Sequence, residues 1–474
     1  MTDVSTPTTT GSTEGGTAEG VDLDARALEL DRSHVFHSWS AQARISPMPV
    51  AGGEGAWFHD ADGNRYLDFA SQLVYLNLGH QHRRLVQAVK DQADRLCTVA
   101  PVFANDARSE AAASIVRHAP GSGPDGTGGP LQHVFFTNGG AEANENAIRM
   151  ARLHTGRHKI LSAYRSYHGA TAGAITLTGE PRRWASEPGI PGVVRFFGPY
   201  LYRSEFHATT EAEERDRALE HLEHVIAMEG PSTIAAIILE PVVGTNGVLV
   251  PPDGYLQGVR ELCDRHGILM ICDEVMVGFG RVGEWFAADR WGVVPDLVSF
   301  AKGVNSGYVP LGGVIVHRDV AATFAEHAYP GGLTYSGHPL ACAVAVESIR
   351  VFEEEDIPGR ARRLGEEVIR PELERIAAAH PSVGEVRGLG CFFAIELVRD
   401  RATREPLVPF NAAGDAAAPV AEVVAACRER GVWPFSHFNR LHIAPPLVIG
   451  EDDLRAGLAA IDEALAVADR HVDA

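Results

Sequence analysis

Residues 268–303 of the chain read ILMICDEVMVGFGRVGEWFAADRWGVVPDLVSFAKG. This stretch contains two short apolar runs, ILMIC (268–272) and LVSFA (297–301), and an ionisable residue follows each run directly, Asp273 or Lys302. Short apolar runs bounded by turn residues are typical of strands that are buried on both faces. Open α/β sheets bind ligands at the carboxyl ends of their strands, so Asp273 and Lys302 are the first candidates for a functional site.

Comparable runs lie on both sides of this stretch, and helical patterns such as 141–154 and 255–266 separate several of them. The runs are HVFFT (133–137), KILSA (159–163), IAAIILE (234–240) and GGVIV (312–316). Apolar strands that alternate with helices predict an α/β fold with a mostly parallel sheet covered on both faces. From about Ser336 the pattern changes to long alanine-rich helices with fewer strands, which predicts a second, smaller α+β domain.

Composition excludes several classes of protein. The chain has 474 residues, of which 45% are hydrophobic and 22% are charged, as is ordinary for a globular protein. Its net charge of −20 argues against nucleic-acid binding and against a basic membrane-surface protein. No run approaches the roughly 18 apolar residues of a membrane span. Six cysteines without a C-x-x-C pair predict reduced thiols in a cytoplasmic protein.

Three familiar ligand motifs are absent or out of context. GFGRVG (278–283) matches G-x-G-x-x-G, but it follows an acidic pair instead of a strand and opens no amphipathic helix. The strand ending in Asp-Glu resembles the Mg²⁺-binding strand of NTPases, but no lysine has the flanking residues of a phosphate loop. No spacing of histidines and acids predicts a metal site, so we expect none.

Lysine is scarce, because it occurs only at Lys90, Lys159 and Lys302 among the 42 positively charged residues. Lys90 lies in an amphipathic helical pattern and Lys159 opens a strand beside other basic residues, so both are consistent with surface positions. Lys302 lies in the uncharged stretch SFAKGVNSG. An amine in apolar surroundings has a lowered pKa, which favours a Schiff base with a carbonyl cofactor.

Three further features fit such a cofactor. The segment TNGGAE (137–142) leaves a strand and opens a helix, where free N–H groups and the helix dipole attract a phosphate. Tyr167 and His168 follow the next strand and offer rings that could cover a flat group. Asp273 could be a structural cap, but an acid is also what pyridoxal phosphate (PLP) needs beside its ring nitrogen. The order of these features along the chain is more informative than any one of them.

Several motifs together resemble those of the class III PLP-dependent aminotransferases, a family that includes ω-amino acid, ornithine and GABA transaminases. They are FFTNGGAEANENAIRMAR, SYHG, ILEPVVG, ICDEVMVGFGRVG, FAKG and GGLTYSGHPLACA, and the resemblance extends over nearly all of the chain after the first 20 residues. It implies the PLP-dependent transferase fold type I and a homodimer with shared active sites, which could pair into a tetramer. The expected regions are a disordered tail (1–20), an N-terminal segment contributing to the small domain (21–75), a large PLP-binding domain (76–335) and a C-terminal small domain (336–474).

The resemblance also implies roles for individual residues. Lys302 would form the Schiff base with PLP and move the proton, and Asp273 would pair with the ring nitrogen. Val275 and Tyr167 would lie on opposite faces of the ring. The other expected cofactor contacts are the phosphate-binding Gly139, Gly140 and Ala141, the ring neighbours His168 and Glu240, and Thr334, which would reach the phosphate of the neighbouring subunit.

Departures from the family pattern concern the substrate. Ornithine- and GABA-type members have a glutamate after the EPV motif that gates an arginine, whereas this chain has Thr245 and His442 at those positions. Phe435 stands where the ω-amine:pyruvate branch tends to have an arginine, and Arg440 is a possible substitute. The residues expected to line the substrate pocket are Trp39, Leu73, Tyr75 and Arg440, although packing in the core is an equal alternative for Trp39.

We therefore expect a transaminase that moves an amino group from an amine or ω-amino acid, such as taurine or β-alanine, to pyruvate or 2-oxoglutarate. The mechanism would be ping-pong, with PLP carrying the amino group between the two half-reactions. The alternatives are an ornithine- or GABA-type transaminase and an aminomutase or decarboxylating transaminase of the same fold. A non-catalytic binding homologue is a further alternative, but it would be expected to have lost some of the residues named above.

Overall fold

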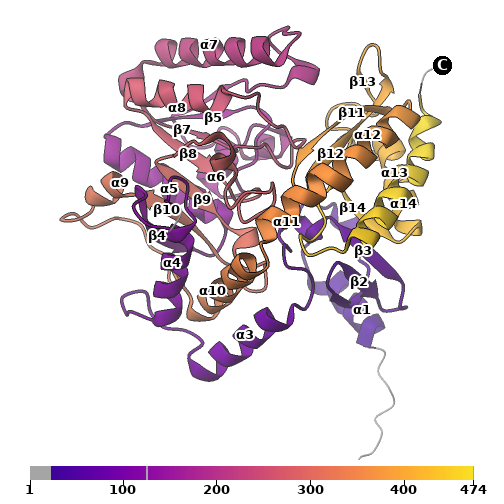
Figure 1. Ribbon diagram of the computed structural model, residues 1–474, viewed down its shortest axis with the longest axis horizontal. Coiled ribbons are helices and arrows are strands. Elements are labelled where there is room, and N and C mark those ends of the chain that lie inside the picture. Colours follow the sequence, from indigo (N-terminus) through magenta and orange to yellow (C-terminus); the bar gives the residue numbers. More distant parts are fainter. Residues whose placement is uncertain (1–22, 124–125, 473–474) are drawn as a thin grey trace, which may run out of the picture. The chain divides into compact units, whose positions relative to one another are not determined.

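The computed structural model describes residues 23–123 and 126–472 (Figure 1). The tail predicted for residues 1–20 lies outside the described residues. The described chain divides into two units, residues 23–52 with 58–65, and residues 53–57 with 66–472. The second unit contains both central sheets described below, and the domain boundaries expected from the sequence stay a prediction.

The first unit holds α1 (Leu23–His34), most of β1 (Val50–Glu54) and most of β2 (Trp57–Asp60). It also contains a turn at Asp62-Gly63-Asn64 between β2 and the start of β3. The carboxylate of Asp60 accepts hydrogen bonds from the backbone N–H of Asn64 at 2.8 Å and from its side-chain amide at 2.9 Å. Gly63 has a φ of 84°, which an L side chain rarely adopts.

The larger sheet of the second unit has seven strands in the order β4-β10-β9-β8-β7-β5-β6. Neighbouring strands from β9 to β6 are parallel, and β10 is antiparallel to both β4 and β9. The mostly parallel sheet predicted from the sequence is thus confirmed. Its strands are β4 (Leu131–Thr137), β5 (Lys159–Ala163), β6 (Val193–Phe196), β7 (Ile234–Leu239), β8 (Leu269–Asp273), β9 (Leu297–Phe300) and β10 (Gly312–His317).

The central strands β7, β8 and β9 are buried along their whole length because both faces of the sheet are covered. Along β8, Leu269 and Ile271 pack into one buried cluster, whereas Met270 and Cys272 pack into another on the opposite face. Helix α5 (Gly140–Thr155) covers the first face, and α7 (Glu211–Glu229) and α8 (Tyr255–His266) lie over the second (Figure 1). Gly156 and Gly267 end α5 and α8 in the left-handed conformation, as helix C-caps often do.

The second sheet comprises β3 (Arg65–Phe69), β14 (Val432–His437), β15 (Arg440–Ile443), β12 (Phe392–Asp400) and β11 (Val383–Leu389), in that spatial order, and β13 (Glu405–Pro406) pairs with β12. Only the β3–β14 pair is parallel among these. Helices α12 (Arg370–Ala379), α13 (Ala418–Glu429) and α14 (Glu451–Asp469) pack beside it. This part of the chain therefore has the α+β character predicted from about residue 336 onward.

The remaining helices connect these layers. Helices α4 and α10 pack against each other, and α4 also contacts β4 (Figure 1). Their bounds are α2 (Ser71–Val74), α3 (Arg83–Arg95), α4 (Asp106–Arg117), α6 (Ala172–Leu177), α9 (Arg318–Ala322), α10 (Pro339–Glu354) and α11 (Ile357–Leu364).

Three whole-chain features bear on the predictions. All six cysteines are free, and five of them are buried, but Cys97 is exposed. Within residues 23–123 and 126–472, no helix is both long and apolar enough to cross a membrane. The same residues contain no group of three or more histidine, cysteine, aspartate or glutamate side chains arranged to hold a metal ion.

Candidate active site

A cavity of about 420 Å³ opens at the carboxyl ends of β7, β8 and β9. Its wall includes Asp273 and Lys302, the two residues that follow the apolar runs of the opening stretch, together with Glu240 from the end of β7. The parallel register of β8 and β9 brings those strand ends together, since Asp273 lies opposite Ser299. Of the three lysines, Lys302 alone lines this cavity.

Lys302 has an unusual backbone and a shifted pKa. Its φ is 47°, in the left-handed region that non-glycine residues occupy mainly where surrounding structure enforces it. Burial lowers the pKa of the Lys302 amine from 10.5 to about 8, although the carboxylates of Asp273 and Glu240 oppose the shift. The positive charges of Arg182 and Arg281 lower it further. A substantial fraction of neutral amine is therefore present near neutral pH.

The carboxylate of Asp273 is buried and held by three donors. Its Oδ2 lies 2.7 Å from Nδ1 of His168 and 2.8 Å from Nδ2 of Asn144. Its Oδ1 accepts a hydrogen bond from the backbone N–H of Val275 at 3.1 Å. These donors fix the orientation of the carboxylate at the wall of the cavity.

Asn144 was missed in the sequence analysis. It also donates to the backbone carbonyl of His168 at 2.7 Å, so it connects the histidine and the aspartate. The signal that could have identified it is its spacing, because Asn144 follows Gly140 by four residues and residues four apart share a helix face.

The N-terminus of α5, where the sequence predicts an anion cradle, lies at the cavity. Gly139, Gly140 and Ala141 line the cavity, and the first N–H groups of a helix have no partner inside the helix. A Cβ added at Gly139 would meet open space, whereas one at Gly140 would lie 2.7 Å from a methyl group of Val275. Gly140 therefore lets Val275 approach, and Gly139 faces room for a ligand.

The backbone of Tyr167 is hydrogen-bonded to a residue of the cavity wall, and one face of its ring is covered. Its N–H donates to Oε1 of Glu240 at 3.0 Å. The guanidinium of Arg182 lies over the ring, 3.7 Å from its centre. One face of the tyrosine is thus occupied, which leaves the other face for a flat group in the cavity.

Glu240 carries a carboxyl group that titrates near neutrality. Burial raises its pKa from 4.5 to about 7, although the nearby His168 and the hydrogen bonds that it accepts oppose the rise. Its Oε2 accepts from the N–H of Gly244 at 2.8 Å. Glu240 thereby fastens the loop that carries Thr245 into the cavity wall.

Only some of the residues predicted to contact the substrate lie at the cavity. Tyr75 lines the cavity. Trp39 belongs to the first unit, where its side chain is 66% exposed. Leu73 and Thr334 are exposed and do not line the cavity of their own chain. Arg440 is buried, lies outside the cavity wall and donates a hydrogen bond to the carbonyl of Asn246.

The gate positions carry no ion pair. Thr245 lines the cavity, and its hydroxyl lies 3.9 Å from Sδ of Met276. His442 is fully buried with its ring near those of Phe392 and Phe435. Burial, followed by the charge of Arg440, lowers the pKa of His442 well below its usual value, so its ring is neutral. The departure from ornithine- and GABA-type members is therefore visible in the geometry.

The residues at the cavity fit PLP. The cradle suits a phosphate, the free face of Tyr167 suits a flat ring, and the oriented carboxylate of Asp273 suits a protonated ring nitrogen. The Lys302 amine, with its lowered pKa, suits a carbonyl carbon.

Comparisons with known proteins agree with this geometry. The family model of class-III aminotransferases matches residues 39–465. The chain is 41% identical to a taurine:2-oxoglutarate aminotransferase of Bifidobacterium kashiwanohense solved with PLP and glutamate, with a TM-score of 0.90 over 95% of this chain and 99% of that one. It is 33% identical to a taurine–pyruvate aminotransferase of Bilophila wadsworthia, with coverage of 93% and 97%. It is 35% identical to a 5-aminovalerate aminotransferase of Pseudomonas aeruginosa, with coverage of 89% and 94%.

Proposed function

We propose that the chain, which belongs to the class III aminotransferases, acts on an ω-amino acid. The enzymes of this family are PLP-dependent and have fold type I. It would transfer the amino group of taurine, β-alanine or a similar donor to pyruvate or 2-oxoglutarate by a ping-pong mechanism. Two of the relatives described above act on taurine and one on 5-aminovalerate by name, and both compounds carry an amine at one end and an acid at the other.

When bound, PLP supplies a carbonyl that accepts the amine and a ring that withdraws electrons from the adjacent carbon. Lys302 would hold the cofactor through Nζ and, once displaced by the donor amine, would take the proton from the substrate carbon and deliver it to the former carbonyl carbon of the cofactor. Asp273 would keep the proton on the ring nitrogen. Val275 and Tyr167 would hold the ring from its two faces, and Gly139, Gly140 and Ala141 would bind the phosphate through backbone N–H groups.

We further propose a homodimer in which Thr334 of each subunit reaches the phosphate bound by the other. The exposure of Thr334 supports this arrangement, since its side chain is free to meet a second copy of the chain. Sedimentation of the purified holoenzyme measures its oligomeric state and so tests the homodimer. A comparison of the rate of cofactor release from Thr334→Ala and from wild type tests the role of Thr334.

The observation that carries the substrate proposal is Arg182. Its Nε pairs with Oε1 of Glu180 at 2.5 Å, and Nη2 is buried without a hydrogen-bond partner among the described residues. The guanidinium is not itself part of the cavity wall; it covers one face of the wall residue Tyr167 and is close enough to Lys302 to lower its pKa. A buried donor without a partner costs free energy, so this position favours a ligand with an anionic group. The sulfonate or carboxylate of an ω-amino acid supplies such a group.

The experiment compares acidic donors with an uncharged amine. Wild-type holoenzyme is mixed with taurine, β-alanine, GABA, ornithine and propylamine, and loss of the visible band of the bound cofactor identifies donors. In Arg182→Met we expect the KM for acidic donors to rise about 10- to 100-fold, since a hydrogen bond to a charged group contributes about 1.5–3 kcal/mol. The KM for propylamine should stay unchanged, and Arg183→Met, which alters the neighbouring partly exposed side chain, is the matched control.

Three kinds of result would contradict the proposal. Reaction with ornithine alone would favour an ornithine-type enzyme in spite of Thr245 and His442. An equal loss for propylamine and the acidic donors in Arg182→Met would remove Arg182 from acid-group recognition. Release of CO₂, or a product in which the amine has moved within one molecule, would identify a decarboxylating transaminase or an aminomutase instead.

A further inference from the structure

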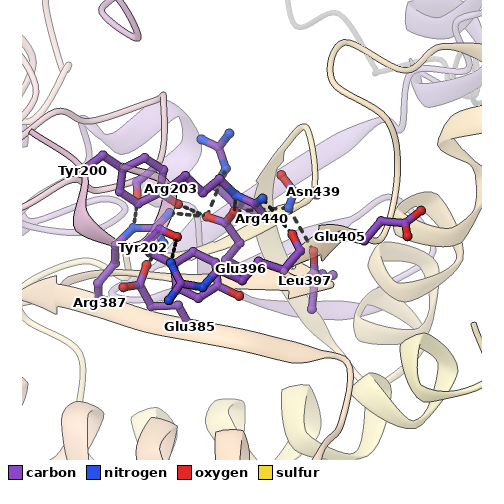
Figure 2. Close-up of polar contacts among 12 residues, drawn as sticks. Tyr200, Tyr202, Arg203, Glu385, Arg387, Glu396, Leu397, Glu405, Asn439 and Arg440 are labelled. Carbon is purple, nitrogen blue, oxygen red and sulfur yellow. Dashed lines mark hydrogen bonds and ion pairs between the residues drawn. The ribbon is translucent and has the colours of Figure 1, made fainter. Parts of the chain in front are cut away.

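A buried cluster of charged side chains lies beside the cavity, and Glu396 of β12 is at its centre (Figure 2). Oε1 of Glu396 accepts from Nε of Arg203 at 2.6 Å. Oε2 accepts from Tyr200 Oη at 2.5 Å and from Arg387 Nη2 at 2.7 Å, and Arg440 Nε lies 3.9 Å away. We call these five residues the Glu396 cluster.

Glu396 is the one carboxylate among these five residues, and Arg387 also pairs with the carboxylate of Glu385. Glu396 is 1% exposed and Arg440 is 4% exposed, so neither charge is solvated by bulk water. Although burial opposes ionisation, the guanidinium groups of Arg387, Arg440 and Arg203 hold the pKa of Glu396 below its usual range. A buried guanidinium without a counter-charge is strongly unfavourable. Removal of the Glu396 charge would therefore weaken the ion pairs that keep the surrounding guanidinium groups in place.

Two of these arginines bind the backbone of the loop that reaches the cavity. Arg387 Nε donates to the carbonyl of Gly247 at 2.7 Å, and Arg440 Nη1 donates to the carbonyl of Asn246. Gly247 has a φ of 132°, and a Cβ at this position would lie 2.7 Å from the Arg440 guanidinium and 2.9 Å from that of Arg387. Glycine is therefore required here for both arginines to approach the loop.

The same loop is fastened at its other end by Glu240, which accepts from Gly244 N–H at 2.8 Å. Between these anchors lies Thr245, a residue of the cavity wall. The loop is closed by hydrogen bonds from the N–H groups of Gly247 and Val248 to the carbonyl of Gly244, both at 3.0 Å. The position of Thr245 is thus determined from both sides, by a residue of the cavity and by the Glu396 cluster.

We propose that Glu396 is a positioning residue that, through Arg387 and Arg440, holds Thr245 in the wall of the substrate cavity and so sets how tightly the donor fits. Arg440 then acts on the loop and not on the acid group of the substrate, in contrast to the role expected from the sequence. The inference rests on the proposed function, since it concerns the donor-binding part of the same cavity.

Glu396→Gln removes the charge while keeping the shape of the side chain, and Gly247→Ala displaces the two arginines while keeping every charge. We expect each variant to raise the KM for taurine or β-alanine roughly three- to ten-fold, as for loss of a hydrogen bond or two. The visible band of the bound cofactor should not change. The KM for propylamine should rise equally, because the loop shapes the cavity for any donor. Since both changes break one linkage, the double variant should show little further effect.

Arg203→Gln is the matched control, because Arg203 contacts Glu396 and the carbonyl of Arg404 but has no hydrogen bond to the 244–247 loop. Amide hydrogen exchange of the peptide containing residues 244–249 gives a readout that needs no substrate. We expect faster exchange in Glu396→Gln and Gly247→Ala and unchanged exchange in Arg203→Gln.

Several outcomes would overturn the positioning role. They are additive KM effects in the double variant, unchanged exchange at 244–249 in both loop variants, or a KM rise confined to acidic donors. If Glu396→Gln does not fold, Gly247→Ala and the exchange measurement still decide the question. Wild-type enzyme that reacts with no ω-amino acid would refute the proposed function, and the exchange comparison would still test Glu396 independently.

Discussion

The pKa of Lys302 should govern the rate at which the apo-enzyme takes up PLP, since only the neutral amine attacks a carbonyl. With a pKa of about 8 in place of 10.5, about a tenth of the amine is neutral at pH 7, against roughly one part in 3,000 for an ordinary lysine. The lowered pKa therefore accelerates uptake at neutral pH by roughly 300-fold. The rate should rise about ten-fold per pH unit below pH 7 and level off above about pH 9.

Stopped-flow measurement of the visible cofactor band between pH 6 and pH 10, at constant ionic strength, tests this expectation. Arg182→Gln removes a positive charge that lowers the pKa of Lys302, so its profile should shift to higher pH. Arg95→Gln, at an exposed residue paired with Asp106, should leave the profile in place. A wild-type midpoint near pH 10, or the same midpoint in wild type and Arg182→Gln, would refute the reasoning.

Three further substitutions test the cofactor site. Lys302→Ala should abolish turnover and the visible absorbance while circular dichroism shows a folded protein; retained activity would exclude Lys302 as the reacting amine. Asp273→Asn should still bind PLP but lose at least about 100-fold in kcat, because the amide cannot hold the proton on the ring nitrogen. An unchanged kcat would remove Asp273 from the mechanism. Gly140→Ala should weaken PLP binding in equilibrium dialysis, because its Cβ would lie 2.7 Å from Val275; unchanged affinity would contradict the packing argument.

Much of the fold follows from local pattern. The apolar runs predicted as strands all form strands, because a strand buried on both faces must be apolar at every position. Strand β6 was missed, since VVRF (193–196) is short and carries Arg195, whose position at the edge of the sheet tolerates a charge. The local sequence pattern also did not predict that β10 runs antiparallel to both of its neighbours. The direction of a strand depends on how the chain returns to the sheet, and a local pattern does not show that.

The structure gathers more of the predicted cofactor residues at one cavity than of the predicted substrate residues. Lys302, Asp273 and the cradle lie at chain positions that any parallel sheet brings to one edge, so their order in the sequence was informative. Arg182 was not identified, because no strand end or glycine motif marks it. Arg440 was placed in the substrate pocket from its sequence position, whereas the structure buries it beside Glu396.

The sequence by itself determined the fold class, the family and the single lysine suited to hold the cofactor, because strand ends and glycine-rich turns carry those signals locally. Only the tertiary structure decided which distant groups meet. It joined Asn144 to Asp273 across 129 positions of the chain, placed Arg182 over Tyr167 and gathered three arginines around one buried carboxylate. The physical reason is that a buried charge or amide must find its partner in space, and sequence spacing does not encode that partner.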